Sequence, residues 1–355
     1  MIDKLVSKRV LGLQSYKVEP LEPGIALDKN EMPWSLETGM LEAVIGRIKA
    51  MGFNRYPDSS CSELKTAISG YAGVERSAIA VGNGSDELIS VLAQTFINPG
   101  DTIAVCNPSF SMYKIYGTIC GARVWEYELD SNFEIDPEEF TEGIEREKTK
   151  LIFLCTPNNP TGNVTGLSEI EQILKKTEGL VVVDEAYFEF SGETAAGLLS
   201  DYENLIILRT FSKAFGLAAL RLGYMLAAPS VILYIDRVRS PFNVNALAQL
   251  VAVEALKNLD TAVERIEAVK LERGRLAKLL NGLTGLECCE SRSNFLLIRT
   301  GHADKIFRRF QQSGIYIKGF SGGRLKDCIR VTVGDPVEND RLYEGIREVL
   351  YDDGR

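Results

Sequence analysis

Between about residues 60 and 230, short apolar segments alternate with amphipathic segments, and this alternation restricts the fold more than any other feature of the sequence. Apolar runs such as 151–155 and 181–183 are bounded by turn residues, which is typical of strands covered on both faces. Strands that alternate with helices indicate a mostly parallel, doubly wound sheet. We therefore expect an α/β protein with a large three-layer αβα domain.

The pattern changes after Pro241. Two long helical patterns, near 244–258 and 261–280, lead into a mixture of strands and helices. The segment before residue 30 contains Pro20, Pro23 and Gly24 and is expected to be irregular. The predicted organisation is an N-terminal arm at 1–29 that joins the small domain, a large domain at 30–250, and a small α+β domain at 251–355.

Composition excludes several classes of protein. The 355 residues include 40 Lys+Arg and 49 Asp+Glu, so the net charge of −9 argues against binding nucleic acid through phosphate contacts. With one histidine a His-rich zinc site cannot be built, and with seven cysteines and no C-x-x-C pair neither a zinc ribbon nor a disulfide framework is indicated, so no metal site is expected. The apolar runs are too short to span a bilayer and the N-terminus lacks a secretory apolar core, so we expect a soluble, cytoplasmic protein without membrane contact.

Four segments at the ends of predicted strands carry the candidate chemistry, because ligands of doubly wound sheets bind beyond the carboxyl ends of the strands. In the first, 82–87, small residues precede a helix whose first N–H groups could bind an anion. It is not a dinucleotide fingerprint, since Glu87 stands where that motif needs glycine. By itself this segment is better explained as a helix cap, with Asp86 and Glu87 complementing the helix dipole.

The next two segments are a rigid loop and a buried acid. Residues 156–162 hold two prolines, two asparagines and a glycine directly after a strand. Asp184 ends a fully apolar strand, and an unpaired buried charge is expensive. For an isolated aspartate, a structural ion pair or a helix cap is the commoner explanation.

The fourth segment, 209–224, places Lys213 among small and apolar residues, with Ser212 beside it and Arg221 eight positions on. A desolvated lysine is readily a neutral nucleophile that forms a Schiff base with a carbonyl, and an arginine can bind a phosphate through two hydrogen bonds. Together the four segments supply the groups needed to hold pyridoxal 5'-phosphate: a lysine for the aldehyde, a carboxylate for the pyridine nitrogen, and amides with an arginine for the phosphate.

At this point the sequence resembles the fold-type I pyridoxal-phosphate aminotransferases of classes I and II, most closely the histidinol-phosphate aminotransferase branch. The resemblance covers nearly the whole chain. The motifs that carry it occur in the family's order: Asn30-Glu31, Arg55-Tyr56-Pro57, Gly84-Ser85-Asp86-Glu87, Asn158-Asn159-Pro160-Thr161-Gly162, Asp184-Glu185-Ala186-Tyr187, Ser212-Lys213-Ala214-Phe215-Gly216 and Ile329-Arg330-Val331-Thr332-Val333-Gly334.

The resemblance implies a role for each matching residue. Lys213 would form the Schiff base and shuttle the proton, Asp184 would keep the pyridine nitrogen protonated, and Asn159 and Tyr187 would hydrogen-bond the ring oxygen. The family's phosphate-binding positions are here Ser85, Asp86, Ser212 and Arg221.

Two aromatic positions also match the family. Phe110 falls where the family stacks an aromatic residue, usually tyrosine, on the cofactor ring. Tyr56 would reach the cofactor of the other subunit, so the resemblance implies a homodimer with shared active sites.

For the substrate, the resemblance implies that Arg330 binds a carboxylate or a distal anion, with Asn30 and Tyr16 near the same pocket. The branch usually has a second arginine where this chain has Lys318. A lysine keeps the charge but loses the planar fork of an arginine, so the anion could be bound by Lys318 or with help from Arg324.

The implied function is a histidinol-phosphate:2-oxoglutarate aminotransferase of histidine biosynthesis, working by a ping-pong mechanism. Its small-molecule partners would be an amino donor and a 2-oxo acid. Three alternatives remain open: an aromatic or broad-specificity aminotransferase, a pyridoxal-phosphate decarboxylase, and a non-enzymatic ligand-binding module on the same scaffold.

Overall fold

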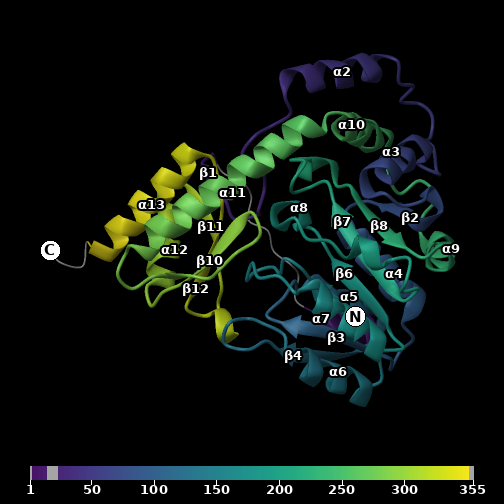
Figure 1. Ribbon diagram of the computed structural model, residues 1–355, viewed down its shortest axis with the longest axis horizontal. Coiled ribbons are helices and arrows are strands. Elements are labelled where there is room, and N and C mark those ends of the chain that lie inside the picture. The colour runs from purple at the N-terminus through teal and green to yellow at the C-terminus, as the bar shows by residue number, and fades with distance from the viewer. Residues whose placement is uncertain (1, 14–22, 352–355) are drawn as a thin grey trace.

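The computed structural model describes residues 2–13 and 23–351, in which two sheets are arranged side by side (Figure 1). The larger sheet has seven strands within these ranges, in the order β2-β8-β7-β6-β5-β3-β4. Its strands are β2 (Ile79–Gly82), β3 (Thr102–Asn107), β4 (Arg123–Glu128), β5 (Thr149–Cys155), β6 (Leu180–Asp184), β7 (Leu205–Thr210) and β8 (Gly223–Ala227). β8 runs antiparallel to β2 and β7, and the other pairings are parallel.

Helices cover both faces of this sheet because its central strands carry apolar residues on both sides. On β6, Val182 packs in one buried cluster with α4, whereas Val181 and Val183 pack in another with α7. The helices of the first side are α4 (Ser85–Phe96), α5 (Met112–Cys120) and α9 (Pro229–Val238), and those of the second include α6 (Pro137–Arg146) and α7 (Leu167–Lys176). The expected three-layer αβα arrangement is confirmed.

A further group of helices lies at the top of the molecule in Figure 1. These helices are α2 (Thr38–Lys49), α3 (Ser62–Ala72) and α10 (Ala246–Lys257), which contact one another. Short helices in the described residues include α1 (Lys8–Leu11), α8 (Phe188–Ser191) and 3-10 turns at Ile2–Lys4, Arg76–Ala78, Ala195–Leu198, Ala218–Leu220 and Gly323–Leu325.

The smaller sheet has the order β1-β11-β12-β10-β9 in the described chain. Its strands are β1 (Ile25–Leu27), β9 (Glu287–Cys288), β10 (Phe295–Arg299), β11 (Ile315–Gly319) and β12 (Cys328–Thr332), and its helices are α11 (Leu259–Asn281), α12 (Ala303–Ser313) and α13 (Pro336–Tyr351). The expected irregularity before residue 30 is wrong for β1, which pairs in parallel with β11 and so adds the start of the chain to the C-terminal sheet. The boundaries at residues 29 and 250 stay predictions.

Candidate active site

The four chemistry-bearing loops meet at the carboxyl edge of the larger sheet, facing the smaller sheet. They follow β2, β5, β6 and β7, and β12 of the smaller sheet contributes Arg330. The guanidinium of Arg330 donates to Asn159 Oδ1 at 2.5 Å, which joins the two parts of the site directly. Parallel strands explain this convergence, because their carboxyl ends lie on one edge.

Lys213 lies in the turn after β7, and its surroundings favour a neutral amine. Its Nζ donates to the Lys29 carbonyl at 2.7 Å and lies 5.9 Å from the centre of the Tyr187 ring. Desolvation, with the nearby charge of Arg330, lowers the pKa of Lys213 to about 8. About a tenth of the lysine is therefore unprotonated and nucleophilic at pH 7, far more than for a lysine with its ordinary pKa.

Asp184 ends β6 with its carboxylate buried. Oδ2 accepts a hydrogen bond from the Tyr113 hydroxyl at 2.7 Å, and Oδ1 accepts one from the Ala186 N–H at 3.1 Å. Burial raises the pKa of Asp184 to about 6, although both hydrogen bonds act to lower it. Among residues 2–13 and 23–351 no lysine or arginine forms an ion pair with this carboxylate, so a cation is still expected beside it.

The start of α4 forms a cradle of backbone N–H groups that has the geometry to accept an anion. No side chain caps the helix, and Gly84, with φ 84°, turns the chain so that the N–H groups of the first turn are left for a ligand. The cradle needs small residues, since a Cβ on Gly223 would lie 2.5 Å from the Ser85 nitrogen. Arg221 Nη1 approaches the buried Ser212 hydroxyl at 3.4 Å.

Arg221 itself has the left-handed φ of 52°, which non-glycine residues adopt rarely. Its half-exposed guanidinium contacts Asp86 Oδ2 at 3.3 Å. This conformation aims a cation across the first turn of α4, as a phosphate group requires.

The smaller sheet supplies a pair of neighbouring cations. Lys318 on β11 is opposite Arg330 on β12, so their side chains lie on one face of the sheet. The pKa of Lys318 is lowered by desolvation and by the charge of Arg330. Arg324 does not take this place, because its guanidinium donates to the Leu129 and Asp130 carbonyls.

Asn30 is fully buried between the two sheets. Its N–H donates to Thr332 Oγ1 at 2.9 Å, and its Nδ2 donates to the Tyr187 hydroxyl at 3.0 Å. Burial raises the pKa of Tyr187, so its hydroxyl stays protonated. Asn294 donates from Nδ2 to the Asn30 carbonyl at 3.0 Å and fixes this residue further.

The two aromatic candidates differ in burial. Phe110 is half-buried and contacts Tyr113 edge-on, with ring centres 5.5 Å apart. Tyr56 is 81% exposed and stacks on Phe242, with ring centres 4.5 Å apart. Tyr16 lies outside the described residues.

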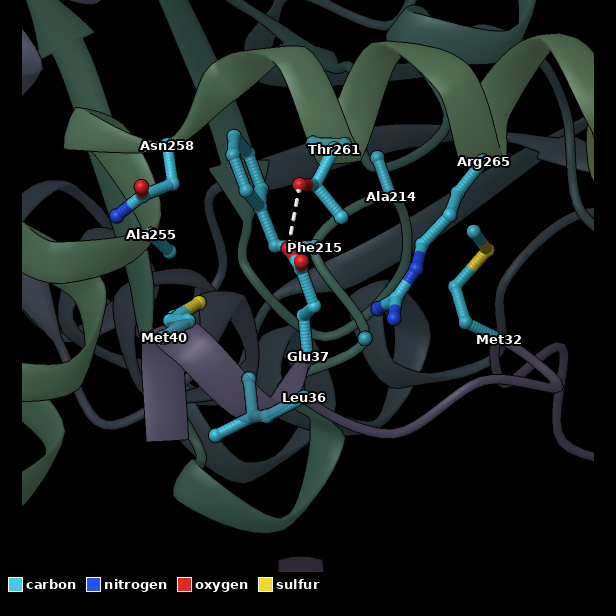
Figure 2. Close-up of a pocket in the computed structure, with 12 residues that line it drawn as sticks. Met32, Leu36, Glu37, Met40, Ala214, Phe215, Ala255, Asn258, Thr261 and Arg265 are labelled. Atoms are coloured by element: carbon cyan, nitrogen blue, oxygen red, sulfur yellow. Dashed lines mark hydrogen bonds between the residues drawn. The ribbon is translucent and has the colours of Figure 1, made fainter. Parts of the chain in front are cut away.

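A small cavity lies behind the Lys213 turn, between α2 and α11 (Figure 2). It is lined by the residues that follow the lysine, including Phe215, and Thr261 donates across its wall to Glu37 at 2.9 Å. Its volume of about 20 Å³ has room for one water molecule and none for a substrate. This cavity is therefore separate from the candidate active site.

The donor set fits pyridoxal phosphate. The buried carboxylate of Asp184 lacks a cation that a protonated pyridine nitrogen would supply. The uncapped start of α4, with Ser212 and Arg221, matches a phosphate group. Lys213, with its lowered pKa, matches the aldehyde.

Sequence reasoning missed several residues that hold the site together. Tyr113 lies three positions after Phe110, and nothing in its local pattern indicated a contact with Asp184. Glu185 and Arg209 form an ion pair at 2.9 Å with exposed fractions of 1% and 3%. An arginine at the end of an apolar strand was the available signal for this pair, because a buried charge requires a partner.

Comparison with known proteins defines the class of protein. Residues 22–346 match the model of the family "Aminotransferase class I and II". The chain therefore belongs to the class I and II aminotransferases, and the fold-type I arrangement expected from the sequence is confirmed.

Individual relatives show which members of the family this chain resembles. A histidinol-phosphate aminotransferase of Thermoanaerobacter sp. (strain X514) is 40% identical over 99% of this chain and 100% of its own length. The solved histidinol-phosphate aminotransferase of Sinorhizobium meliloti in complex with pyridoxal-5'-phosphate superposes with a TM-score of 0.90 at 24% identity, covering 98% of each chain. An L-threonine-O-3-phosphate decarboxylase of Porphyromonas gingivalis superposes with a TM-score of 0.79 at 23% identity, over 92% of this chain and 99% of that chain. The last two likenesses show the fold alone, which several reactions share.

No helix in the described parts of the chain combines the length and the apolar character needed to cross a membrane.

Proposed function

We propose that this protein is a pyridoxal-phosphate-dependent histidinol-phosphate:2-oxoglutarate aminotransferase. The observation that carries the proposal is the half-buried Lys213, whose pKa of about 8 prepares it for Schiff-base chemistry. The names of relatives up to 40% identical over nearly the whole chain support the choice of substrate. Cytoplasmic histidine biosynthesis is the setting that we infer for this reaction.

Pyridoxal phosphate, when bound, supplies an electron sink for the electrons left by removal of a proton from the substrate Cα. The protein must then hold and move that proton. The amine of Lys213 is the base suited to this task, because its lowered pKa leaves part of it unprotonated near neutral pH. With a single histidine in the chain, at the start of α12, Lys213 has no histidine competitor in the site.

Two side chains would orient the cofactor ring through its oxygen. Since Asn30 donates to the Tyr187 hydroxyl, the hydroxyl proton is available to donate to a ligand. Asn159 accepts from Arg330 through Oδ1, which leaves its Nδ2 for the same purpose. Asp184 is mostly ionised above pH 6 and would hold a proton on the ring nitrogen.

The substrate's distal group would be bound by Arg330 and Lys318. These neighbouring cations form a site for a dianion such as a phosphate monoester. A carboxylate, as in 2-oxoglutarate, fits the same pair in the second half of the ping-pong cycle. One site can thus take the two substrates in turn.

The exposed aromatic residues support a homodimer with shared active sites. Tyr56 and Phe242, together with Phe53 at 74% exposure, present apolar surface that a single chain leaves in water. The phosphate cradle is also open on the side of Arg221, whose side chain is 48% exposed. We infer that Tyr56 of a second subunit closes this side.

The first experiment tests for the cofactor. The purified protein is expected to be yellow and to show the visible absorption of Schiff-base-bound pyridoxal phosphate, and Lys213→Ala should lose that band. Lys278→Ala, on the exposed face of α11, serves as the control and should keep it. A colourless protein that takes up no pyridoxal phosphate would contradict the proposal and favour a binding module.

The second experiment tests the substrate. Half-reaction rates with histidinol phosphate, phenylalanine, tyrosine and aspartate should be compared in single turnovers. We expect histidinol phosphate to react with the highest specificity constant. Preference for an unphosphorylated amino acid would instead support an aromatic or broad-specificity aminotransferase, and release of CO₂ would support a decarboxylase.

A further inference from the structure

The carboxylate of Asp184 is held by two donors from different elements. Ala186 donates from the backbone two residues on, and this bond follows from the local turn. Tyr113 donates from α5, which is 71 residues away in sequence, at the short distance of 2.7 Å. Only the second bond therefore depends on how the helix packs on the sheet.

The ring of Tyr113 is held by two aromatic contacts. It is 1% exposed and stacks on Phe153 of β5, with ring centres 4.7 Å apart and planes 9° from parallel. Phe110, the residue expected to cover the cofactor ring, meets it edge-on. Tyr113 thus contacts both Phe110, which is expected to stack on the cofactor ring, and Asp184, which is expected to bind the ring nitrogen.

The hydroxyl of Tyr113 opposes the effect of burial on the pKa of Asp184. Desolvation raises the pKa of Asp184, and the hydrogen bond from Tyr113 is the largest influence that lowers it. Asp86 on α4 and the neighbouring Glu185 raise it further through their charge. Cys155 on β5 and Tyr187 also face this carboxylate and stay neutral, since burial raises the pKa of both.

A shift in the protonation of Asp184 would matter for function. An ionised carboxylate accepts a hydrogen bond from a protonated pyridine nitrogen, whereas a neutral carboxylic acid gives that cation no charge to pair with. A pKa of about 6 lies only slightly below neutral pH, so the loss of one donor is enough to protonate most of the group.

We propose that Tyr113 is a positioning residue that keeps Asp184 ionised and aimed at the pyridine nitrogen of the cofactor. This inference rests on the proposed role of Asp184 in binding pyridoxal phosphate. Tyr113 acts through Asp184 and touches neither substrate nor the reacting atoms.

The test begins with the cofactor-free protein. The titration of Asp184 is followed by infrared difference spectroscopy, with the carboxyl band assigned by its absence in Asp184→Asn. Tyr113→Phe, which keeps the ring and removes the hydroxyl, should move the midpoint upward by about one to two pKa units. An unchanged midpoint would overturn the proposal.

A matched control is Tyr127→Phe. Tyr127 is also buried, and its hydroxyl also donates to a carboxylate, Glu139 Oε2 at 3.0 Å, outside the site. This variant should leave the Asp184 midpoint in place. A similar shift in both variants would mean a general loss of packing and would count against a specific role of Tyr113.

Cofactor affinity gives a second readout. Tyr113→Phe should weaken pyridoxal-phosphate binding about tenfold near pH 6.5, with the deficit shrinking as the pH rises and Asp184 ionises. In an Asp184→Asn background the same substitution should have no pH-dependent effect. A deficit that does not vary with pH, or that persists with its pH dependence in that background, would refute the proposal.

A third variant covers the case in which Tyr113→Phe does not fold. Site-specific replacement of Tyr113 by 3-fluorotyrosine keeps the shape and makes the hydroxyl a stronger donor, so the Asp184 midpoint should fall. A midpoint that stays or rises would contradict the inference. If the wild-type protein bound no pyridoxal phosphate, the proposed function would fail, whereas the titration would still show whether Tyr113 controls Asp184.

Discussion

At the scale of single residues, the proposed substrate site contains Lys318 at a position where the resemblance implies an arginine. Lys318 lies opposite Arg330, and its pKa is lowered by desolvation and by that neighbour. A lysine offers a point charge, whereas an arginine offers a planar fork that matches two phosphate oxygens. The identity of residue 318 should therefore affect phosphorylated substrates more than others.

We expect Lys318→Ala to raise the KM for histidinol phosphate by about 10- to 100-fold, because a charge-assisted hydrogen bond is lost. Lys318→Arg should restore or improve binding. The KM for phenylalanine, which has no distal anion, should change little in either variant, as should the KM values of the surface control Lys278→Ala. Equal losses for histidinol phosphate and phenylalanine would mean that Lys318 does not bind the phosphate.

Glu189 offers a test of stability at the same scale. Its Oε2 is buried without a hydrogen-bond partner, and Tyr71 contacts Oε1 at 3.4 Å. Desolvation raises the pKa of this carboxyl from 4.5 to about 8. Between pH 4.5 and 8 this carboxyl ionises in the unfolded chain but stays protonated in the folded protein, so the free energy of unfolding falls as the pH rises through this range.

Glu189→Gln cannot ionise in either state, so its free energy of unfolding does not fall in this way as the pH rises. Compared with wild type, its free energy of unfolding should rise between pH 5 and pH 8 by on the order of a few kcal/mol. Urea unfolding at several pH values measures the difference, and Glu264→Gln on the exposed face of α11 is the control. A difference independent of pH would show that Glu189 titrates normally.

At the scale of elements, a buried ion pair connects the ends of β6 and β7. Glu185 accepts from the Ala195 N–H at 2.6 Å, from the Thr194 hydroxyl at 2.9 Å and from Arg209 Nε at 2.9 Å. The Arg209 guanidinium also lies 3.8 Å from the centre of the Phe188 ring. Since Asp184 precedes this glutamate and Lys213 follows the strand of this arginine, the pair fixes two site-bearing strand ends relative to each other.

Removing one charge from this pair should destabilise the protein strongly. We expect Glu185→Gln to lower the free energy of unfolding by about 3–5 kcal/mol, because Arg209 is left buried without its counter-ion. Chemical denaturation measures the loss. Glu171→Gln removes the partner of Lys175 at the surface and should have little effect, and a similarly small effect of Glu185→Gln would contradict a structural role for the pair.

At the scale of the whole molecule, the expected dimer can be tested by complementation. If Tyr56 serves the partner's site, Tyr56→Ala and Lys213→Ala impair different parts of each shared site. Mixing the two impaired variants should produce mixed dimers with one intact site, and random reassociation should bring the activity to about a quarter of wild type. No recovery after confirmed subunit exchange would show that each chain builds its own site.

Two arginines of the smaller sheet's region contact the segment around Phe133 in the larger domain. Arg324 and Arg299 of the smaller sheet's region lie over Phe133, at 5.3 and 4.7 Å from its ring centre. Arg299 donates to the Ser131 carbonyl at 2.6 Å. Arg324 was a candidate for phosphate binding by its sequence position, and its place in this contact explains why Lys318 is the better candidate.

The sequence by itself determined the larger sheet and the residues at its carboxyl edge. Apolar strands alternating with helices require a parallel sheet, and such a sheet brings the ends of β5, β6 and β7 together whatever the details of packing. Asp184 and Lys213 could therefore be assigned to one site from local patterns, and the resemblance gave them their roles.

Only the tertiary structure decided which distant groups meet. Asn30 binds Tyr187 across 157 positions of sequence, Tyr113 reaches Asp184 from a helix, and β1 joins the C-terminal sheet. These contacts depend on the packing of one element against another, which leaves no periodic pattern in the chain. Lys213 and Asp184 could be predicted because a buried charge restricts the residues that surround it in the sequence. The groups that hydrogen-bond or pair with these charges could not be predicted, since they come close only when distant elements pack together.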